Sequence, residues 1–228
     1  MIEMPRGRES DRRSERERLV RRYIAGQGVR DPRVLEAMRT VPRERFVPAA
    51  LSRRAYRDEP LPIGHGQVIS QPYLVALMAE AAEVGPDDVV LEIGTGSGYG
   101  AAVLARLAKG VYTIDRLQDF VEAARSRFES LGYDNIEVRC GDGTAGWPEA
   151  APFDAIVVTA GSPSEVPTPL VQQLTVGGRL VIPLGASPRV QDVYRLVKRP
   201  DGTLEERNLG GAYFVPLIGR WGWEEERT

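Results

Sequence analysis

A glycine-rich turn between two apolar segments carries the clearest chemical signal in this sequence. Residues 89–93 form an apolar run typical of a buried strand, and the turn after it contains Gly94, Gly96 and Gly98. Glycines let the backbone approach a ligand closely, and the helical pattern that follows offers unpaired N–H groups at its start. A second apolar run ends in Asp115, about where a doubly wound sheet places a carboxylate that binds a ribose diol. The segment therefore predicts a site for a nucleoside-containing cofactor.

Two cofactor classes are compatible with this turn. Residues 96–101 satisfy the looser G-x-G-x-x-G/A pattern of dinucleotide-binding folds, which is weak evidence when taken alone. Glu92, at the end of the strand, can instead help to hold a cationic amino-acid head group, and the turn has no basic residue for a pyrophosphate. These features favour a methyltransferase that uses S-adenosylmethionine, with dinucleotide binding and a purely structural turn as the alternatives.

Composition bounds the class of protein. The 228 residues are 42% hydrophobic and 27% charged, which is ordinary for a globular protein, and no apolar run approaches the ~18 residues of a membrane span. The N-terminus lacks the apolar core of a signal peptide. The single cysteine, Cys140, excludes an internal disulfide and favours a reducing compartment. We therefore expect a soluble, cytoplasmic protein, and the single histidine, His65, argues against a histidine-based metal site.

Charge is distributed unevenly along the chain. Residues 1–57 contain 16 arginines and 8 acidic residues, whereas the remainder has an excess of acidic residues. Opposite charges alternate in the basic section, which is typical of a solvated helix face, and no aromatic residues are interleaved there to stack on bases. We expect no nucleic acid and no membrane as a partner.

Hydrophobic periodicity predicts an α/β fold with a doubly wound, mostly parallel, Rossmann-like sheet. The chain divides into a disordered N-terminus (1–13), a helical N-terminal region with an active-site loop (14–83), a cofactor-binding core (84–185) and C-terminal strands that complete the sheet and the substrate site (186–228). Ser14 and Glu17 form a capping-box pattern that predicts the first helix. Strands are expected near 89–93, 111–115, 136–139, 154–159, 179–184, 191–198 and 212–218; helices are expected near 31–38, 72–83, 99–108, 117–131 and 167–174.

Several segments together resemble the protein-L-isoaspartate O-methyltransferase family, from about residue 14 to residue 219. The most restricted of them is Leu61-Pro-Ile-Gly-His-Gly-Gln-Val-Ile-Ser-Gln-Pro-Tyr73, which precedes the glycine turn. The others are Leu91-Glu-Ile-Gly-Thr-Gly-Ser-Gly-Tyr99, Gly141-Asp-Gly143 with Gly146-Trp-Pro148, Ala151-Pro-Phe-Asp-Ala-Ile-Val-Val-Thr-Ala160 and Gly177-Gly-Arg-Leu-Val-Ile-Pro183. By this resemblance the chain is identified as a member of that family, whose enzymes are class I methyltransferases.

The resemblance implies methyl transfer from S-adenosyl-L-methionine to the free α-carboxylate of L-isoaspartyl residues in damaged proteins and peptides, with S-adenosyl-L-homocysteine as the product. The ester closes to a succinimide, which starts repair to aspartate. A carboxylate is already ionised near neutral pH, so the reaction needs neither a general base nor a metal. The site mainly has to align the reactants and exclude water. The expected partners are isoaspartyl-containing proteins and peptides, and we expect a monomer.

The resemblance also assigns roles to residues. Ser70 is expected to be the active-site serine, which hydrogen-bonds or orients the substrate carboxylate without acting as a nucleophile. Glu92 and the turn glycines are expected at the methionine end of the cofactor, Asp115 at the ribose, and Asp142 with Gly143 at the adenine. The remaining expected cofactor-binding residues are Val68, Ile69, Tyr73, Gly98, Arg116 and Thr159, and the expected substrate-binding residues besides Ser70 are Ala212 and Tyr213.

A few positions depart from the family's pattern. Gly100 stands where family members often have glutamine, and Ala212-Tyr213 replaces a more usual Val-Arg pair. Trp221 and Trp223 extend past the usual end, and we expect them to pack on the core. The alternatives to repair are a methyltransferase for a normal aspartyl peptide, a cofactor-binding scaffold without catalysis, and a small-molecule methyltransferase.

Overall fold

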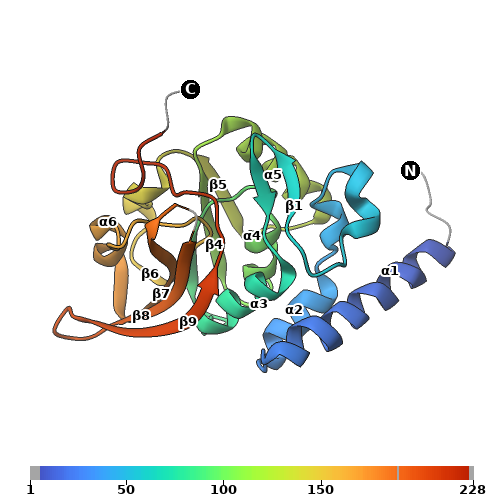
Figure 1. Ribbon diagram of the computed structural model, residues 1–228, viewed down its shortest axis with the longest axis horizontal. Helices are drawn as coiled ribbons and strands as arrows, with labels where there is room; N and C mark the ends of the chain where they lie inside the picture. The colour runs from blue at the N-terminus through green and yellow to red at the C-terminus, as the bar shows by residue number, and fades with distance from the viewer. Residues whose placement is uncertain (1–5, 189, 226–228) are drawn as a thin grey trace.

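Across residues 6–188 and 190–225, the part of the chain that the computed structural model describes, seven strands form one sheet (Figure 1). They are β3 (Val89–Ile93), β4 (Gly110–Asp115), β5 (Ile136–Cys140), β6 (Phe153–Val158), β7 (Leu174–Ser187), β8 (Val190–Lys198) and β9 (Leu204–Ala212). Their order is β5-β4-β3-β6-β7-β8-β9, and pairing is parallel from β5 to β7 and antiparallel from β7 to β9. After β3 the chain adds β4 and β5 on one side of this strand, and it then adds β6 and β7 on the other side. This reversal of strand order places a crevice at the carboxyl end of β3.

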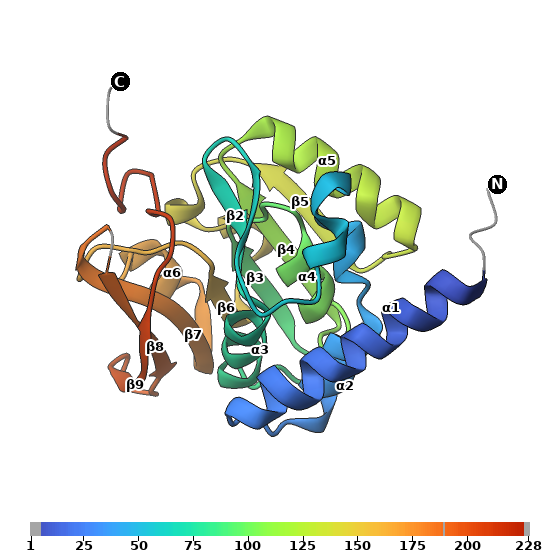
Figure 2. The same cartoon turned by 45° about the vertical axis from the view of Figure 1, so that its right-hand side comes forward.

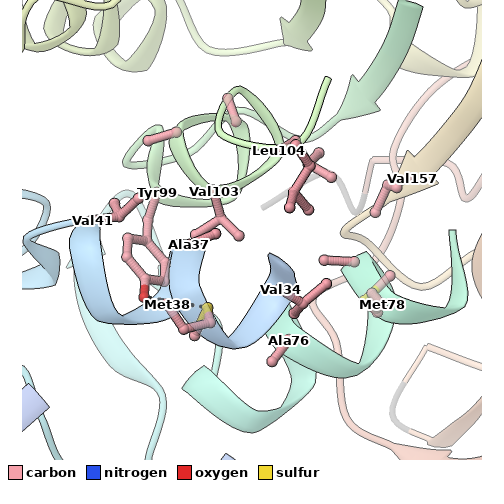
Figure 3. Packing of buried hydrophobic residues seen from close by; sticks show 14 of the residues in the cluster. Val34, Ala37, Met38, Val41, Ala76, Met78, Tyr99, Val103, Leu104 and Val157 are labelled. Carbon is pink, nitrogen blue, oxygen red and sulfur yellow. Dashed lines mark hydrogen bonds between the residues drawn. The ribbon is translucent and has the colours of Figure 1, made fainter. Parts of the chain in front are cut away.

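Both faces of the sheet are covered, because successive apolar residues of the central strands point to opposite sides. Val90 belongs to one buried cluster, with residues of the N-terminal helices, whereas Leu91 belongs to a second cluster on the other face. The helices are α1 (Arg6–Leu19), α2 (Pro32–Thr40), α3 (Pro72–Ala81), α4 (Tyr99–Leu104), α5 (Gln118–Leu131) and α6 (Thr168–Gln172). Figure 3 shows α2 packed between α3 and α4 through Val34, Met38 and Tyr99. None of the described helices is long and apolar enough to cross a membrane.

A hairpin and several short helical turns connect these elements. The hairpin consists of β1 (Leu61–Gly64) and β2 (Gln67–Ile69), which pair antiparallel, and it leads directly into α3. The helical turns are Val20–Ile24, Ala25–Gln27, Arg43–Arg45, Ala49–Arg54, Gly143–Ala145 and Pro148–Ala150. Figure 2 shows the hairpin in front of the central strands, with α1 and α2 beside α3 and α4.

The sequence-based prediction for the N-terminus needs correction. Residues 6–13, expected to be disordered, belong to α1, and Ser14 lies inside this helix instead of capping it; residues 1–5 lie outside the described part of the chain. Arg12 explains part of the difference, because its guanidinium bonds Glu15 one turn on and reaches Ser52, 40 residues away. A contact at that separation leaves no trace in local periodicity.

The predicted strand over 212–218 was also wrong, because the last strand is β9 and ends at Ala212. β9 is an edge strand with mostly exposed, polar side chains, so it lacks the apolar alternation that predicts a strand. The segment after it contains the buried side chains Phe214 and Leu217, which imitate a strand pattern. It is held instead by a bond from the Phe214 amide to Gln191 and by an isolated bridge between Pro216 and Gly161. The other predicted strands and helices are confirmed, with shifted ends.

Candidate active site

A cleft lies at the carboxyl ends of β3, β4 and β6, between the glycine turn and the β1–β2 hairpin. A methyl group added at Gly96 would lie 3.4 Å from the Ile63 side chain, so the hairpin packs directly on the turn. Of the residues predicted from the sequence, the cleft brings together Val68, Ile69, Ser70, Glu92, Gly94, Gly96, Asp115, Arg116, Gly143 and Thr159.

The glycine turn has a conformation that larger residues cannot adopt. Gly94 has a φ of 98°, and a Cβ atom there would lie 2.4 Å from Thr159 Oγ1. Gly98 has a φ of 87° at the start of α4, and its Cβ would lie 2.8 Å from the Phe128 ring. Gly94 therefore lets Thr159 pack against the turn, whereas Gly98 lies outside the cleft lining and permits close packing of α4 against α5.

Asp115, at the end of β4, organises the turn. Its Oδ2 accepts a hydrogen bond from the Gly96 amide at 2.7 Å, and its Oδ1 accepts one from the Leu117 amide at 3.0 Å. Both oxygens keep further acceptor capacity, because an ionised carboxylate offers about four lone-pair sites. The carboxylate is thus rigidly held at the edge of the cleft, and it can accept bonds from a diol.

Glu92 is a buried carboxyl group that lines the same cleft. Thr113 Oγ1 donates to Glu92 Oε2 at 2.6 Å, and Thr95 Oγ1 lies 2.7 Å from Thr113 Oγ1. The pKa of Glu92 is raised to about 8, mainly by burial; the nearby Asp115 charge also raises it, and the Thr113 bond opposes both effects. No arginine or lysine in the described part of the chain forms an ion pair with Glu92. A cationic ligand beside it would favour the ionised form of this carboxyl group.

The absence of a side chain at Gly100 leaves room for the Glu92 carboxyl group. A Cβ atom at Gly100 would lie 2.2 Å from Glu92 Oε1, so any larger residue would displace the Glu92 side chain. The Glu92 orientation in this chain therefore depends on a glycine at a position where the sequence pattern departs from that of the family.

Ser70 and Thr159 face the cleft from opposite elements. Ser70 follows β2 and precedes α3, is half-buried, and its hydroxyl forms no hydrogen bond with the residues that the structure describes. The Thr159 hydroxyl lies 3.0 Å from the Ile93 carbonyl and 2.9 Å from the Gly94 carbonyl. Both residues also border a small apolar space that reaches Glu92. The Ser70 hydroxyl is thus available to a ligand, and Thr159 fixes the wall opposite.

Asp142, predicted at the adenine, does not line the cleft. Its Oδ1 accepts bonds from the Thr144 amide and hydroxyl, and its Oδ2 accepts one from the Arg220 amide at 2.9 Å. The carboxylate therefore anchors the C-terminal segment, while the neighbouring Gly143 reaches the cleft.

Three other predicted residues lie outside the cleft lining. Tyr73 is in the first turn of α3, and its amide bonds Asp58. Ala212 ends β9, and Tyr213 beside it is 70% exposed. These residues can meet a ligand only if it extends beyond the cleft.

One wall of the cleft was not assigned from the sequence. It is formed by residues 215–218, with Leu117 and Phe120 contributing near the start of α5. The apolar run at 214–217 was the available signal, but it gave no indication that the segment returns to the glycine turn. Trp223 supports this wall, because its indole N–H donates to the Gly161 carbonyl at 2.9 Å, whereas Trp221 is 38% exposed.

Comparisons with known proteins agree with this geometry. The family model described as protein-L-isoaspartate(D-aspartate) O-methyltransferase matches residues 14–222. A Pelobacter propionicus protein named protein-L-isoaspartate O-methyltransferase 2 is 56% identical over 208 residues, which are 91% of this chain and 92% of the relative. A Methanoculleus marisnigri protein-L-isoaspartate O-methyltransferase is 56% identical over 215 residues, covering 94% and 96% of the two chains.

Solved structures give the same result. A structure named protein-L-isoaspartate O-methyltransferase superposes with a TM-score of 0.79 at 32% identity, over 92% of this chain and 67% of the other. A Plasmodium falciparum protein, assigned to the same activity and crystallised with S-adenosyl-L-homocysteine, has a TM-score of 0.76 at 25% identity. It matches over 89% of this chain and 98% of its own.

Proposed function

This chain belongs to the protein-L-isoaspartate(D-aspartate) O-methyltransferase family, and we infer that it methylates L-isoaspartyl residues of proteins and peptides. The observation that carries this inference is the family match along residues 14–222, with relatives of that name at 56% identity over nine-tenths of the chain. When bound, S-adenosyl-L-methionine supplies a methyl group on a cationic sulfur, which passes to a carboxylate oxygen and leaves S-adenosyl-L-homocysteine. The backbone amide nitrogen of the following residue then attacks the ester carbonyl and methanol leaves, and hydrolysis of the resulting succinimide can give normal aspartate.

We propose that the cleft holds the cofactor through groups that suit its parts. Glu92 is a buried carboxyl group whose ionised form a cation would stabilise, so it is suited to the ammonium of the methionine end. Asp115 has free acceptor capacity for the ribose hydroxyls, and Gly94 and Gly96 let the backbone approach the ligand. Gly143 is the proposed contact for the adenine.

We propose that Ser70 donates a hydrogen bond to the substrate carboxylate and orients it. Ser70 lines the cleft, and its hydroxyl has no competing partner among the described residues. The carboxylate is already ionised near neutral pH, so the protein need not remove a proton from it. The contribution of the chain is then alignment of the oxygen with the methyl group and exclusion of water by the hairpin and residues 215–218.

Tyr213 and Ala212, at the end of β9, are suited to contact a peptide that extends out of the cleft. We also propose that the protein acts as a cytoplasmic monomer on peptides and not on nucleic acid; the single cysteine, Cys140, is consistent with a reducing compartment.

Repeated incubation of an isoaspartyl peptide with the protein and S-adenosyl-L-methionine tests the proposed function. Each turnover should release S-adenosyl-L-homocysteine and form a labile methyl ester, and the aspartyl peptide should accumulate over successive cycles. A protein that binds the cofactor but forms no ester on this peptide would show that the proposed function is wrong.

A further inference from the structure

The carboxylate of Asp58 joins the segment that carries Ser70 to the N-terminal region. Asp58 Oδ1 accepts a hydrogen bond from the Tyr73 amide at 2.9 Å, and Oδ2 accepts one from the Gln71 side-chain amide at 2.8 Å. The side-chain amide of Gln27 also donates to Oδ2, at 3.1 Å. Three donors from two parts of the chain, residues 71–73 and Gln27, therefore meet at one carboxylate.

Asp58 supplies the cap that α3 lacks. The residue at the N-cap position, Gln71, forms no side-chain hydrogen bond to the helix, and Pro72 follows it. The first available amide of the helix, that of Tyr73, is instead bound by the remote Asp58 carboxylate. A negative charge at this end also interacts favourably with the helix dipole.

The bonds to Asp58 fix the residues directly after Ser70. Upstream, Ile69 pairs with Leu61 in the β1–β2 hairpin. Downstream, Gln71 and Tyr73 are both bound to Asp58, three residues before Leu61. One short stretch of chain, residues 58–61, thus holds Ser70 from both sides. The Ser70 hydroxyl has no hydrogen-bond partner in the described residues, so its location depends on these backbone restraints.

We propose that Asp58 is a positioning residue for the methyl-transfer step, acting through Gln71 and Tyr73 to hold Ser70 against the substrate carboxylate. The Asp58 side chain does not line the cleft, so it acts without touching the substrate there. This inference rests on the proposed role of Ser70.

A double-mutant cycle in kcat tests the proposal. Asp58→Ala should lower kcat about 10- to 100-fold, because small displacements of an orienting group have effects of this size. The Kd for S-adenosyl-L-methionine should stay within about twofold. In a Ser70→Ala background, Asp58→Ala should cause little further loss, because both changes remove the same oriented hydroxyl.

The matched control is Asp31→Ala. Asp31 caps α2 through the Arg33 and Val34 amides, as Asp58 caps α3, but no residue of α2 or of the segment just before it lines the cleft. Its loss should leave kcat within about twofold of the wild-type value. If Asp58→Ala fails to fold, the cycle can be measured with Asp58→Asn and with Gln71→Ala, each combined with Ser70→Ala. The single variant Asp58→Asn should then retain more activity than the double variant Asp58→Asn/Gln71→Ala.

Three results would overturn the inference. If Asp58→Ala has a wild-type kcat while Ser70→Ala is slow, Asp58 does not position Ser70, although the proposed role of Ser70 itself is supported. Equal fold-losses from Asp58→Ala in the wild-type and Ser70→Ala backgrounds would mean that Asp58 acts independently of the serine. A wild-type kcat in Ser70→Ala would remove both this inference and the proposed role of Ser70.

Discussion

At the scale of a single residue, the fold buries the carboxyl group of Glu92 without a cationic partner among the described residues. The side chain is 1% exposed, and burial raises its pKa from 4.5 to about 8. In the protein without cofactor the group is therefore mostly neutral at pH 7. The ammonium of a bound ligand would favour the ionised form, so binding should release a proton from this residue.

The raised pKa makes stability depend on pH in a definite direction. The folded state holds the Glu92 proton more tightly than the unfolded state, so its contribution to stability is complete below pH 4.5. That contribution falls as the pH rises toward 8, by up to roughly 5 kcal/mol. Denaturant unfolding at several pH values should show that Glu92→Gln loses less stability over this range than the wild-type protein. Parallel pH profiles of the two proteins would contradict the assignment.

Asp115 and Ser70 should affect different steps. Asp115→Ala should weaken S-adenosyl-L-methionine binding about 10- to 100-fold, because it removes two charge-assisted acceptors and loosens the turn at Gly96. Ser70→Ala should leave the cofactor Kd within about twofold and lower kcat. Calorimetric binding and single-turnover kinetics measure the two effects separately, with the exposed Asp134→Ala as a control that changes neither. A Ser70→Ala protein with weak cofactor binding and unchanged kcat would reverse the proposed roles.

Sequence reasoning located residues whose position follows from nearby sequence, and it missed contacts made with distant parts of the chain. Glu92 and Asp115 each end an apolar run beside the turn, so the pattern placed both at the cleft. The Thr113 hydroxyl that bonds Glu92 gave no sequence signal, because a threonine inside a strand is ordinary. The resemblance to the family, with the spacing after Asp115, predicted Asp142 at the adenine; the bond from the Arg220 amide to its carboxylate, 78 residues along the chain, gave no sequence signal.

At the scale of elements, the C-terminal segment and the loop at Asp142 are packed too closely for a larger residue between them. A Cβ atom at Gly219 would lie 2.1 Å from Asp142 Oδ1. The neighbouring Ile218 lines the cleft, so displacement of this segment should open one cleft wall.

We therefore predict that Gly219→Ala destabilises the protein by about 1–3 kcal/mol and weakens cofactor binding several-fold, because overpacking forces the backbone to shift. Thermal unfolding with and without S-adenosyl-L-homocysteine would measure both effects. The control is Gly110→Ala, where an added methyl group meets no atom within 4 Å. Equal effects of the two substitutions would show that the contact with Asp142 does not hold the wall.

The same scale explains which elements were predictable. The strands β3, β4 and β6 are buried and apolar, so periodicity identified them. The edge strand β9 is polar because its side chains face solvent, and the segment after it is apolar because Phe214 and Leu217 fill the core. The local pattern therefore predicted a strand over 212–218, where the structure has an irregular segment, and it missed the strand β9.

At the scale of the whole molecule, the region with Ser70 and the cofactor core share one buried cluster. Leu19 and Ile24 from the N-terminal helices belong to the same cluster as Val90 and Val103 of the core. We predict that Leu19→Ala lowers stability by about 2–5 kcal/mol, because it leaves a cavity in this shared core. Measured below its unfolding transition, kcat should remain near the wild-type value. A large loss of kcat in fully folded protein would instead connect α1 directly to the site.

The preference between two matched peptides is the most direct test of the central claim. One peptide contains an L-isoaspartyl residue and the other, of identical sequence, contains a normal aspartyl residue; both are incubated with S-adenosyl-L-methionine under the same conditions. We predict methyl-ester formation on the isoaspartyl peptide, with little or none on the aspartyl peptide. A kcat/KM that favours the aspartyl peptide would contradict the account and indicate a methyltransferase for a normal aspartyl substrate.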